Sequence, residues 1–259
     1  MYMKSISLTA ERCAVFFDSG IGGLNLLYQC VKRLPGLKYY YIADNYNVPY
    51  GNKSADEIYS LVSNALSGIE RLKPLALVVA CNTVTAQCIA EFRNRYDFPV
   101  IGIQPAVKQA AEVGGRCVVL ATSSTVNSKA FENLAARFPN IDMRVHECKT
   151  LAAFVEDNIF NLPKRLPLGL LPEENADSVV LGCTHYVYVK RQIEERYKCP
   201  VFDGISGTAD HFAKIVGMAD HNYAFLGKND HLHYGKPKIV FLGGNIDKNS
   251  AIFCGLGTK

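Results

Sequence analysis

The chain has 259 residues, of which 49% are hydrophobic and 20% are charged, and its formal net charge is +4. This is the mix of an ordinary globular protein, and the length suits one large domain or two small ones. The small positive charge is spread along the chain, which argues against a nucleic-acid-binding or membrane-binding surface.

The N-terminal segment does not have the pattern of a signal peptide, because Glu11 and Arg12 interrupt it. The longest apolar stretch, Leu75 to Cys81, is too short to span a bilayer. We therefore expect a cytoplasmic protein. The 9 cysteines are scattered, without a CxxC pair or zinc-type spacing, so we expect neither disulfides nor a metal site.

Short apolar runs, several of them rich in Val, Ile and Leu, predict strands that are covered on both faces. In chain order the predicted strands are Cys13–Phe17, Tyr39–Ile42, Leu75–Ala80, Val100–Ile103, Cys117–Ala121, Met143–Glu147, Val179–Gly182, Val201–Asp203 and Ile239–Leu242. Amphipathic stretches between them predict helices over Ser54–Leu72, Thr85–Arg95, Ser124–Arg137, Leu151–Phe160 and Tyr188–Tyr197. This alternation predicts an α/β fold with mainly parallel sheets flanked by helices.

The sequence also contains a faint internal repeat. Val78–Thr83 and Val180–His185 are both apolar strands that end in a cysteine followed by polar residues. The strand ends near Asp18 and Ala121 stand at nearly the same spacing. The repeat predicts two pseudo-symmetric α/β domains, residues 1–98 plus 206–259 and residues 99–205, with the active site in the cleft between them.

Cys81 and Cys183 are the strongest candidates for chemistry. Each ends a predicted strand and precedes a helix, where the helix dipole favours a thiolate and where Asn82, Thr83 or Thr184 could cap the helix. A single buried cysteine is more often structural, but two in matching settings suit proton exchange on opposite faces of one carbon. His185, two residues after Cys183, is the natural proton partner of that thiol.

Two acidic residues allow more than one interpretation. Asp18 opens a glycine-rich turn whose spacing fits neither a dinucleotide-binding motif nor a P-loop. It is either a helix cap or a carboxylate that accepts a proton or binds a substrate ammonium. Glu156 lies in a helical stretch, and the sequence alone favours a solvated helix face for it.

Four segments together resemble motifs of the bacterial glutamate racemases, within the aspartate/glutamate racemase family. They are Phe17–Leu24 (FDSGIGGL), Asn47–Lys53 (NVPYGNK), Val79–Thr83 (VACNT) and Leu181–His185 (LGCTH). The resemblance implies interconversion of L- and D-glutamate without pyridoxal phosphate or metal, in a family that supplies D-glutamate for peptidoglycan synthesis. It also allows a homodimer, in a family whose subunit packing varies.

The resemblance assigns roles to individual residues. It implies that Cys81 and Cys183 are the two catalytic acid/base residues, with Asp18 assisting the first and His185 the second. Glu156 matches a further catalytic acid. The implied substrate-binding residues are Asp18, Ser19, Pro49, Tyr50, Gly51, Asn82, Thr83, Thr122, Thr125, Thr184 and His185.

Two other functions remain open at this point. One is an aspartate or other amino-acid racemase on the same scaffold, and the other is a non-catalytic amino-acid-binding regulatory protein. The related aspartate racemases usually carry Glu after the second Cys-Thr pair and lack the Pro-Tyr-Gly segment. His185 and Pro49–Gly51 therefore favour glutamate.

Overall fold

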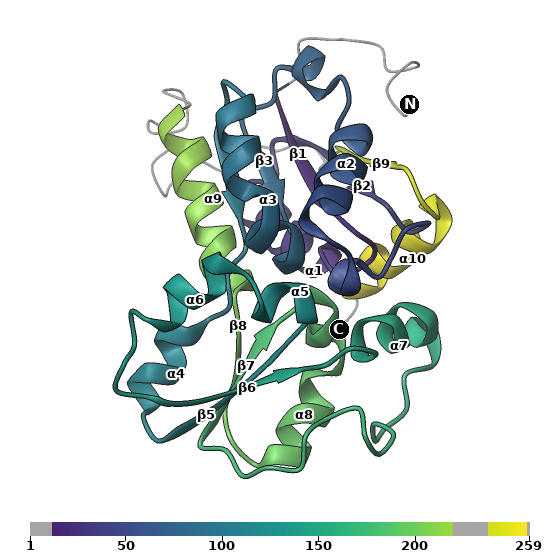
Figure 1. The fold of residues 1–259 in the computed structure, drawn as a ribbon. Helices are drawn as coiled ribbons and strands as arrows, with labels where there is room; N and C mark the ends of the chain where they lie inside the picture. Colours follow the sequence, from purple (N-terminus) through teal and green to yellow (C-terminus); the bar gives the residue numbers. More distant parts are fainter. Residues whose placement is uncertain (1–11, 220–237, 258–259) are drawn as a thin grey trace, which may run out of the picture.

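The computed structural model describes residues 12–219 and 238–257, which form two parallel β-sheets with helices around them (Figure 1). The first sheet has the strand order β4-β3-β1-β2-β9 and the second the order β6-β5-β7-β8. All pairings between neighbouring strands are parallel. The strands are β1 (Cys13–Asp18), β2 (Lys38–Ala43), β3 (Leu77–Val79), β4 (Val100–Gly102), β5 (Arg116–Ala121), β6 (Asp142–Glu147), β7 (Ser178–Gly182), β8 (Val201–Asp203) and β9 (Lys238–Leu242).

The two sheets repeat one topology, which confirms the predicted pair of α/β domains. Read in one direction, β4-β3-β1-β2 of the first sheet corresponds to β8-β7-β5-β6 of the second, and β9 is added at the edge of the first sheet. The predicted division after residue 98 assigns β4 to the second domain. In the structure β4 instead belongs to the first sheet, where its Val100 and Ile101 pair with residues of β3.

All of the predicted strands are present, but the predicted helices differ in detail. The predicted helix over Ser54–Leu72 is interrupted at Gly68, whose φ of 85° lies in the left-handed region. The predicted helix over Ser124–Arg137 is split at Ser128, whose side chain accepts a hydrogen bond from the Phe131 amide and starts a new helix. Four observed helices were not among the predicted ranges: α1 (Leu24–Arg33), α4 (Val107–Val113), α9 (Ile205–Ala219) and α10 (Ile246–Leu256).

In the part of the chain that the structure describes, the helices lie between the strands in chain order, and four short 3-10 turns (η) accompany them. The α-helices are α1 (Leu24–Arg33), α2 (Ala55–Ala65), α3 (Asn82–Arg95), α4 (Val107–Val113), α5 (Ser123–Val126), α6 (Lys129–Ala135), α7 (Leu151–Asn158), α8 (Lys190–Tyr197), α9 (Ile205–Ala219) and α10 (Ile246–Leu256). The 3-10 turns are η1 (Tyr50–Asn52), η2 (Ile69–Leu72), η3 (Ile159–Asn161) and η4 (Thr184–Val189).

The central strands of each sheet are buried on both faces, which explains why their sequences do not alternate. Neighbouring residues of β1 point into different apolar clusters, Phe16 into one and Phe17 into another. In β5, Val118 and Val119 are divided between two clusters in the same way. A strand with two apolar faces reads as a continuous hydrophobic run.

The chain crosses between the domains so that equivalent strand ends face each other. After β8 the chain returns to the first domain, where α9 packs against α1 (Figure 1). The carboxyl ends of β1 and β3 thereby face those of β5 and β7, the edge at which ligands bind in open α/β sheets. Within the described residues, no helix is long and apolar enough to cross a membrane.

Candidate active site

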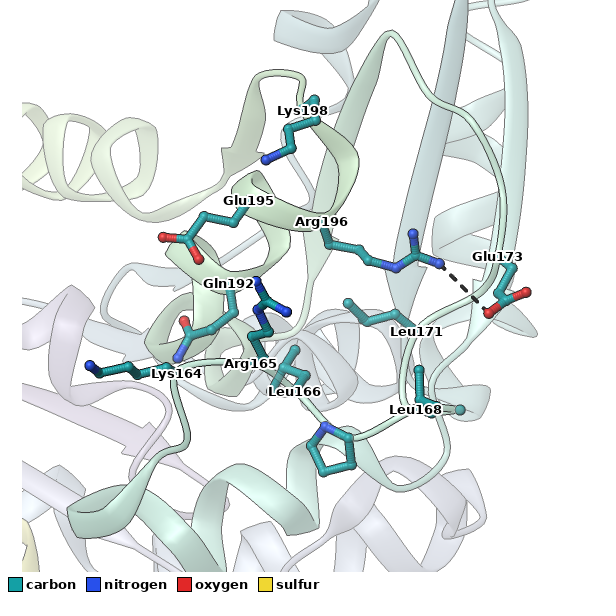
Figure 2. A pocket seen from close by; sticks show the side chains of 12 residues that line it. Lys164, Arg165, Leu166, Leu168, Leu171, Glu173, Gln192, Glu195, Arg196 and Lys198 are labelled. Atoms are coloured by element: carbon teal, nitrogen blue, oxygen red, sulfur yellow. Dashed lines mark ion pairs between the residues drawn. The ribbon is translucent and has the colours of Figure 1, made fainter.

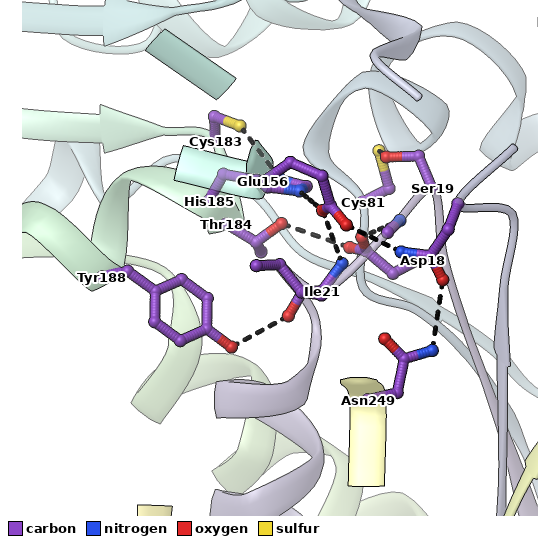
Figure 3. Close-up of polar contacts among 12 residues, drawn as sticks. Asp18, Ser19, Ile21, Cys81, Glu156, Cys183, Thr184, His185, Tyr188 and Asn249 are labelled. Atoms are coloured by element: carbon purple, nitrogen blue, oxygen red, sulfur yellow. Dashed lines mark hydrogen bonds and ion pairs between the residues drawn. The ribbon is translucent and has the colours of Figure 1, made fainter. Parts of the chain in front are cut away.

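Cys81 and Cys183 approach the domain interface from equivalent positions. Cys81 follows β3 and is the N-cap residue of α3, while Cys183 follows β7 and is the N-cap residue of η4. Both are nearly inaccessible to solvent, with exposed fractions of 6% and 7%. Figure 3 shows the two side chains entering one region of polar contacts from the two domains.

The surroundings of Cys81 correct one expectation from the sequence. A helix N-terminus should favour the thiolate, yet the pKa of Cys81 rises to about 12. Burial is the largest cause, the charges of Asp18 and Cys183 add to it, and the Val84 amide and the Ser19 hydroxyl oppose it. Desolvation therefore outweighs the helix terminus. The Ser19 hydroxyl lies 3.7 Å from the Cys81 sulfur and is its hydrogen-bond partner.

Two expected helix caps are absent. Neither Asn82 nor Thr83 caps α3, because Cys81 occupies the N-cap position. Thr184 does not cap a helix either, since it lies inside the 3-10 turn η4. The polar side chains of these residues are therefore available for other contacts.

Cys183, His185 and Glu156 form a chain of contacts. Nδ1 of His185 lies 3.9 Å from the Cys183 sulfur, and Nε2 lies 2.8 Å from Oε2 of Glu156 (Figure 3). Burial alone would lower the pKa of His185, but its contacts with Cys183 and Glu156, together with the charge of Asp18, hold it well above its usual value. His185 can therefore carry a proton beside the Cys183 sulfur at neutral pH.

Glu156 is not on a solvated helix face, contrary to the interpretation favoured by its sequence context. Its exposed fraction is 4%, and its carboxylate points into the domain interface. Oε2 also accepts a hydrogen bond from the Ile21 amide at 3.0 Å, and Oε1 accepts one from Asn45 at 2.7 Å. Burial raises the pKa of Glu156, but His185, the Ile21 amide and Lys248 together lower it to about 2.

Asp18 is fully buried at the end of β1 and connects the two domains. Oδ1 accepts a hydrogen bond from the Gly20 amide at 2.8 Å, and Oδ2 accepts one from the Thr184 hydroxyl at 3.2 Å. Burial raises the pKa of Asp18 to about 6, against the lowering effect of His185 and the Gly20 amide. A carboxyl group with this pKa can both take up and release a proton near neutral pH.

The raised pKa of Asp18 predicts a pH-dependent cost in stability. Because this pKa is higher in the folded protein than its usual 3.8, the stabilising contribution is present at low pH and is lost as the pH rises through about 6. Asp18→Asn removes this titration. Relative to the wild type, its free energy of unfolding should increase by about 3 kcal/mol between about pH 3 and pH 7. Urea denaturation across this range measures the difference, and a difference independent of pH would contradict the assignment.

Glycine allows the first turn to approach the second domain. A Cβ atom at Gly22 would lie 2.5 Å from the Thr184 hydroxyl oxygen and 2.6 Å from Nδ1 of His185. A Cβ atom at Gly51 would lie 2.7 Å from the Cβ atom of Thr122. Both glycines are therefore required by close contact between the domains, and the glycine-rich turn is a packing feature of the interface.

Threonines line the interface between α3 and α5. The hydroxyl oxygens of Thr83 and Thr122 lie 2.9 Å apart, and the same distance separates those of Thr122 and Thr125. Asn82 beside them is 4% exposed, and its Nδ2 has no hydrogen-bond partner. A buried amide donor without a partner is costly, so this group is suited to a ligand that accepts a hydrogen bond.

The Pro-Tyr-Gly segment, Pro49–Gly51, packs beside the site and makes hydrogen bonds to Asp44 and Ser124. The Tyr50 hydroxyl donates to Asp44 at 2.6 Å, so it is already used within the first domain. The Gly51 carbonyl accepts a hydrogen bond from Ser124, which holds η1 against α5. Pro49 is half-buried next to them. The structure thus gives Tyr50 and Gly51 clear packing roles.

Three residues of this network were not among the residues predicted from the sequence. Asn45 is the second residue after β2, so the rule that polar residues after buried strands gather at one sheet edge could have identified it. Lys248 in α10 bonds to Glu156, and Tyr188 in η4 donates to the Ile21 carbonyl at 2.9 Å. No sequence signal marks Lys248 or Tyr188.

A surface cavity beside α8 lies apart from this network. It has a volume of about 420 Å³ and lies between α8 and the segment over residues 164–173 (Figure 2). An ion pair between Arg196 and Glu173, 3.9 Å apart, spans one side. None of the predicted site residues lines it. Across residues 12–219 and 238–257, no group of three or more His, Cys, Asp or Glu side chains could hold a metal ion.

Comparisons with known proteins agree with this geometry. Residues 25–211 match the model of the Asp/Glu/Hydantoin racemase family. A glutamate racemase of Clostridium novyi is 38% identical over 205 residues, covering 75% of this chain and 79% of the relative.

The chain is also similar to solved structures of glutamate racemases. A glutamate racemase of Bacillus anthracis, RacE1, has a TM-score of 0.75 and 26% identity, with 95% of this chain and 94% of that chain covered. The Escherichia coli glutamate racemase, solved with L-glutamate and an activator, has a TM-score of 0.71 and 31% identity, with 80% and 82% covered. The chain therefore belongs to the Asp/Glu/hydantoin racemase family of amino-acid racemases, and its described fold is that of the glutamate racemases.

Proposed function

We propose that this chain interconverts L- and D-glutamate by proton transfer between Cys81 and Cys183. The observation that carries the proposal is the placement of the two thiols. Each follows the equivalent strand of one of two matching sheets, and both are buried at the same interface. Two acid/base groups that approach from opposite domains suit the two faces of one Cα atom.

The residues around the two thiols differ, so we assign a different assisting residue to each thiol. His185 contacts the Cys183 sulfur and is held by Glu156, so it serves that thiol. Asp18 acts on Cys81 through its charge, and the Ser19 hydroxyl makes the direct contact. In the proposed reaction one thiolate removes the Cα proton while the opposite thiol delivers a proton to the other face. By resemblance, Cys183 acts on L-glutamate and Cys81 on D-glutamate.

The substrate carboxylates and ammonium need partners in the same region. The unpartnered Nδ2 of Asn82 and the hydroxyl groups of Thr83, Thr122 and Thr125 are suited to a carboxylate. Asp18 is suited to the substrate ammonium, whose positive charge would also lower the pKa of the buried Cys81 thiol. Because both thiols are almost fully buried, the domains have to part before substrate enters.

Activity without an added cofactor is the first test of this proposal. After dialysis and treatment with EDTA, the protein should still racemise L-glutamate, because the proposed proton transfers use only its own side chains. Circular dichroism of the substrate follows the reaction, with L-aspartate measured in parallel. A strict requirement for pyridoxal phosphate or zinc would contradict the mechanism, and faster turnover of aspartate would contradict the substrate assignment.

Three further expectations, the first from the sequence pattern and the other two from the resemblance, remain predictions. They are a cytoplasmic location, a role in supplying D-glutamate for peptidoglycan synthesis, and a homodimer. Sedimentation velocity of the purified protein tests the last of these directly.

A further inference from the structure

Lys248 reaches the catalytic network from an element on which the proposed mechanism does not otherwise depend. It lies in α10, which belongs to the first domain and packs against β9 and α1. Its target, Glu156, lies in α7 of the second domain. Figure 1 shows α10 and α7 facing each other across the boundary between the domains. The contact therefore exists only while the two domains are together.

The Lys248 ammonium makes two hydrogen bonds to one residue. It donates to the backbone carbonyl oxygen of Glu156 at 2.6 Å and to Oε1 of its side chain at 3.1 Å. Glu156 stands in the last turn of α7, where carbonyl groups lack helical partners and the helix dipole favours a positive charge. One cation thus caps the end of α7 and fixes the direction of the Glu156 side chain.

The position of α10 over Glu156 is itself well determined. Oδ1 of Asn45 accepts hydrogen bonds from the Asn245 amide at 3.3 Å and from Nδ2 of Asn249 at 3.2 Å. Nδ2 of the same Asn45 donates to Oε1 of Glu156. The start of α10 and the buried carboxylate are therefore joined through Asn45 as well as through Lys248.

The charge of Lys248 matters because Glu156 is buried beside a group that exchanges protons. Its side chain is 5% exposed, and two of its four bonded partners, the Ile21 amide and Asn45, are neutral. His185 is positive only while it holds its proton. When it does not, the Lys248 ammonium is the remaining cation bonded to the carboxylate, and a buried carboxylate without a cation tends to take up a proton.

We propose that Lys248 is a positioning residue that, on domain closure, keeps Glu156 ionised and directed at His185, so that His185 can serve Cys183. This inference rests on the proposed racemase function. Without Lys248, the carboxylate loses the one bonded cation whose charge does not depend on the transferred proton, and its direction toward His185 is no longer fixed. The imidazole is then held less firmly beside the Cys183 sulfur.

Lys248→Met tests the proposal, because it keeps the length of the side chain and removes the charge. We expect kcat to fall roughly tenfold, which corresponds to about 1.4 kcal/mol, because Glu156 loses a charged hydrogen bond that directs its carboxylate at His185. The primary isotope effect should rise with L-glutamate deuterated at Cα and change little with the D form. Lys248→Arg should restore most of the activity, because it keeps the charge and the hydrogen bonds.

A double-mutant cycle separates this role from a purely structural one. In a Glu156→Gln background, Lys248→Met should cause little further loss, because its effect passes through the carboxylate. Lys190→Met is the matched control, since Lys190 forms a comparable ion pair with Asp203 at 2.9 Å in the second domain. It should leave kcat and both isotope effects unchanged.

The outcomes distinguish this inference from the function on which it rests. A wild-type protein that does not racemise glutamate would overturn the proposed function and the inference together. An active wild type with normal turnover in Lys248→Met would overturn the inference alone. The inference is also overturned if the losses from Lys248→Met and Glu156→Gln are fully additive, or if both enantiomers show equal isotope effects.

Discussion

Replacement of either Cys81 or Cys183 by serine should lower racemisation by orders of magnitude and leave the fold intact. Serine has nearly the same shape as cysteine, so the packing of these buried positions is preserved. Its hydroxyl is far less acidic than a thiol, so it cannot form the base that removes the Cα proton. Because the two thiols act in one reaction, loss of either should affect both directions. Initial rates from L- and from D-glutamate measure the effect, and circular dichroism of the protein reports the fold.

Cys88→Ser is the matched control for this pair. Cys88 is also buried, at 2% exposure, and lies in α3 close to Cys81 along the chain. Its sulfur donates to the Ala55 carbonyl at 3.7 Å, a bond that a serine hydroxyl can also make. This variant should keep near-normal activity. If Cys81→Ser or Cys183→Ser also kept near-normal turnover, that cysteine would be a core residue and the two-thiol mechanism would be wrong.

His185→Asn should reduce kcat by about 10²- to 10⁴-fold, the usual contribution of general acid–base assistance. One imidazole contacts both the Cys183 sulfur and Glu156 through its two nitrogens. An asparagine side chain is too short to make both contacts and does not hold a proton at neutral pH. The variant should therefore impair proton transfer by Cys183 and leave proton transfer by Cys81 unimpaired.

Isotope effects identify which thiol is affected. His185→Asn should raise the primary isotope effect most with L-glutamate deuterated at Cα, and Asp18→Asn most with the D form. His146→Asn is the control, because His146 lies 2.6 Å from Glu174 in a histidine–glutamate pair that takes no part in the contacts around the cysteines. Identical isotope-effect patterns in the two site variants would disprove the pairing of assistants with thiols, even if racemisation itself were confirmed.

The sequence alone determined the strands and the duplication. Strands buried on both faces are uninterrupted apolar runs, and a run such as Cys117–Ala121 is recognisable without a tertiary structure. The cysteine that ends such a run is equally visible, and its recurrence at Cys183 predicted two matching domains. The observed orders β4-β3-β1-β2 and β8-β7-β5-β6 confirm this prediction. Helix ends were harder, because breaks such as that at Gly68 depend on single-residue conformations.

The tertiary structure decided the electrostatics of the site and the partners of each group. Glu156 reads as part of an exposed helix face, yet it is buried because Ile21, Asn45 and Lys248 from the first domain close over it. Cys81 lies at a helix N-terminus, yet its pKa is raised because its burial outweighs the helix dipole. Local sequence determines the hydrophobic period of an element and the ends of a strand. The desolvation and ion pairing of a buried group depend on atoms from distant segments of the chain. They are therefore established only when both domains are folded and in contact.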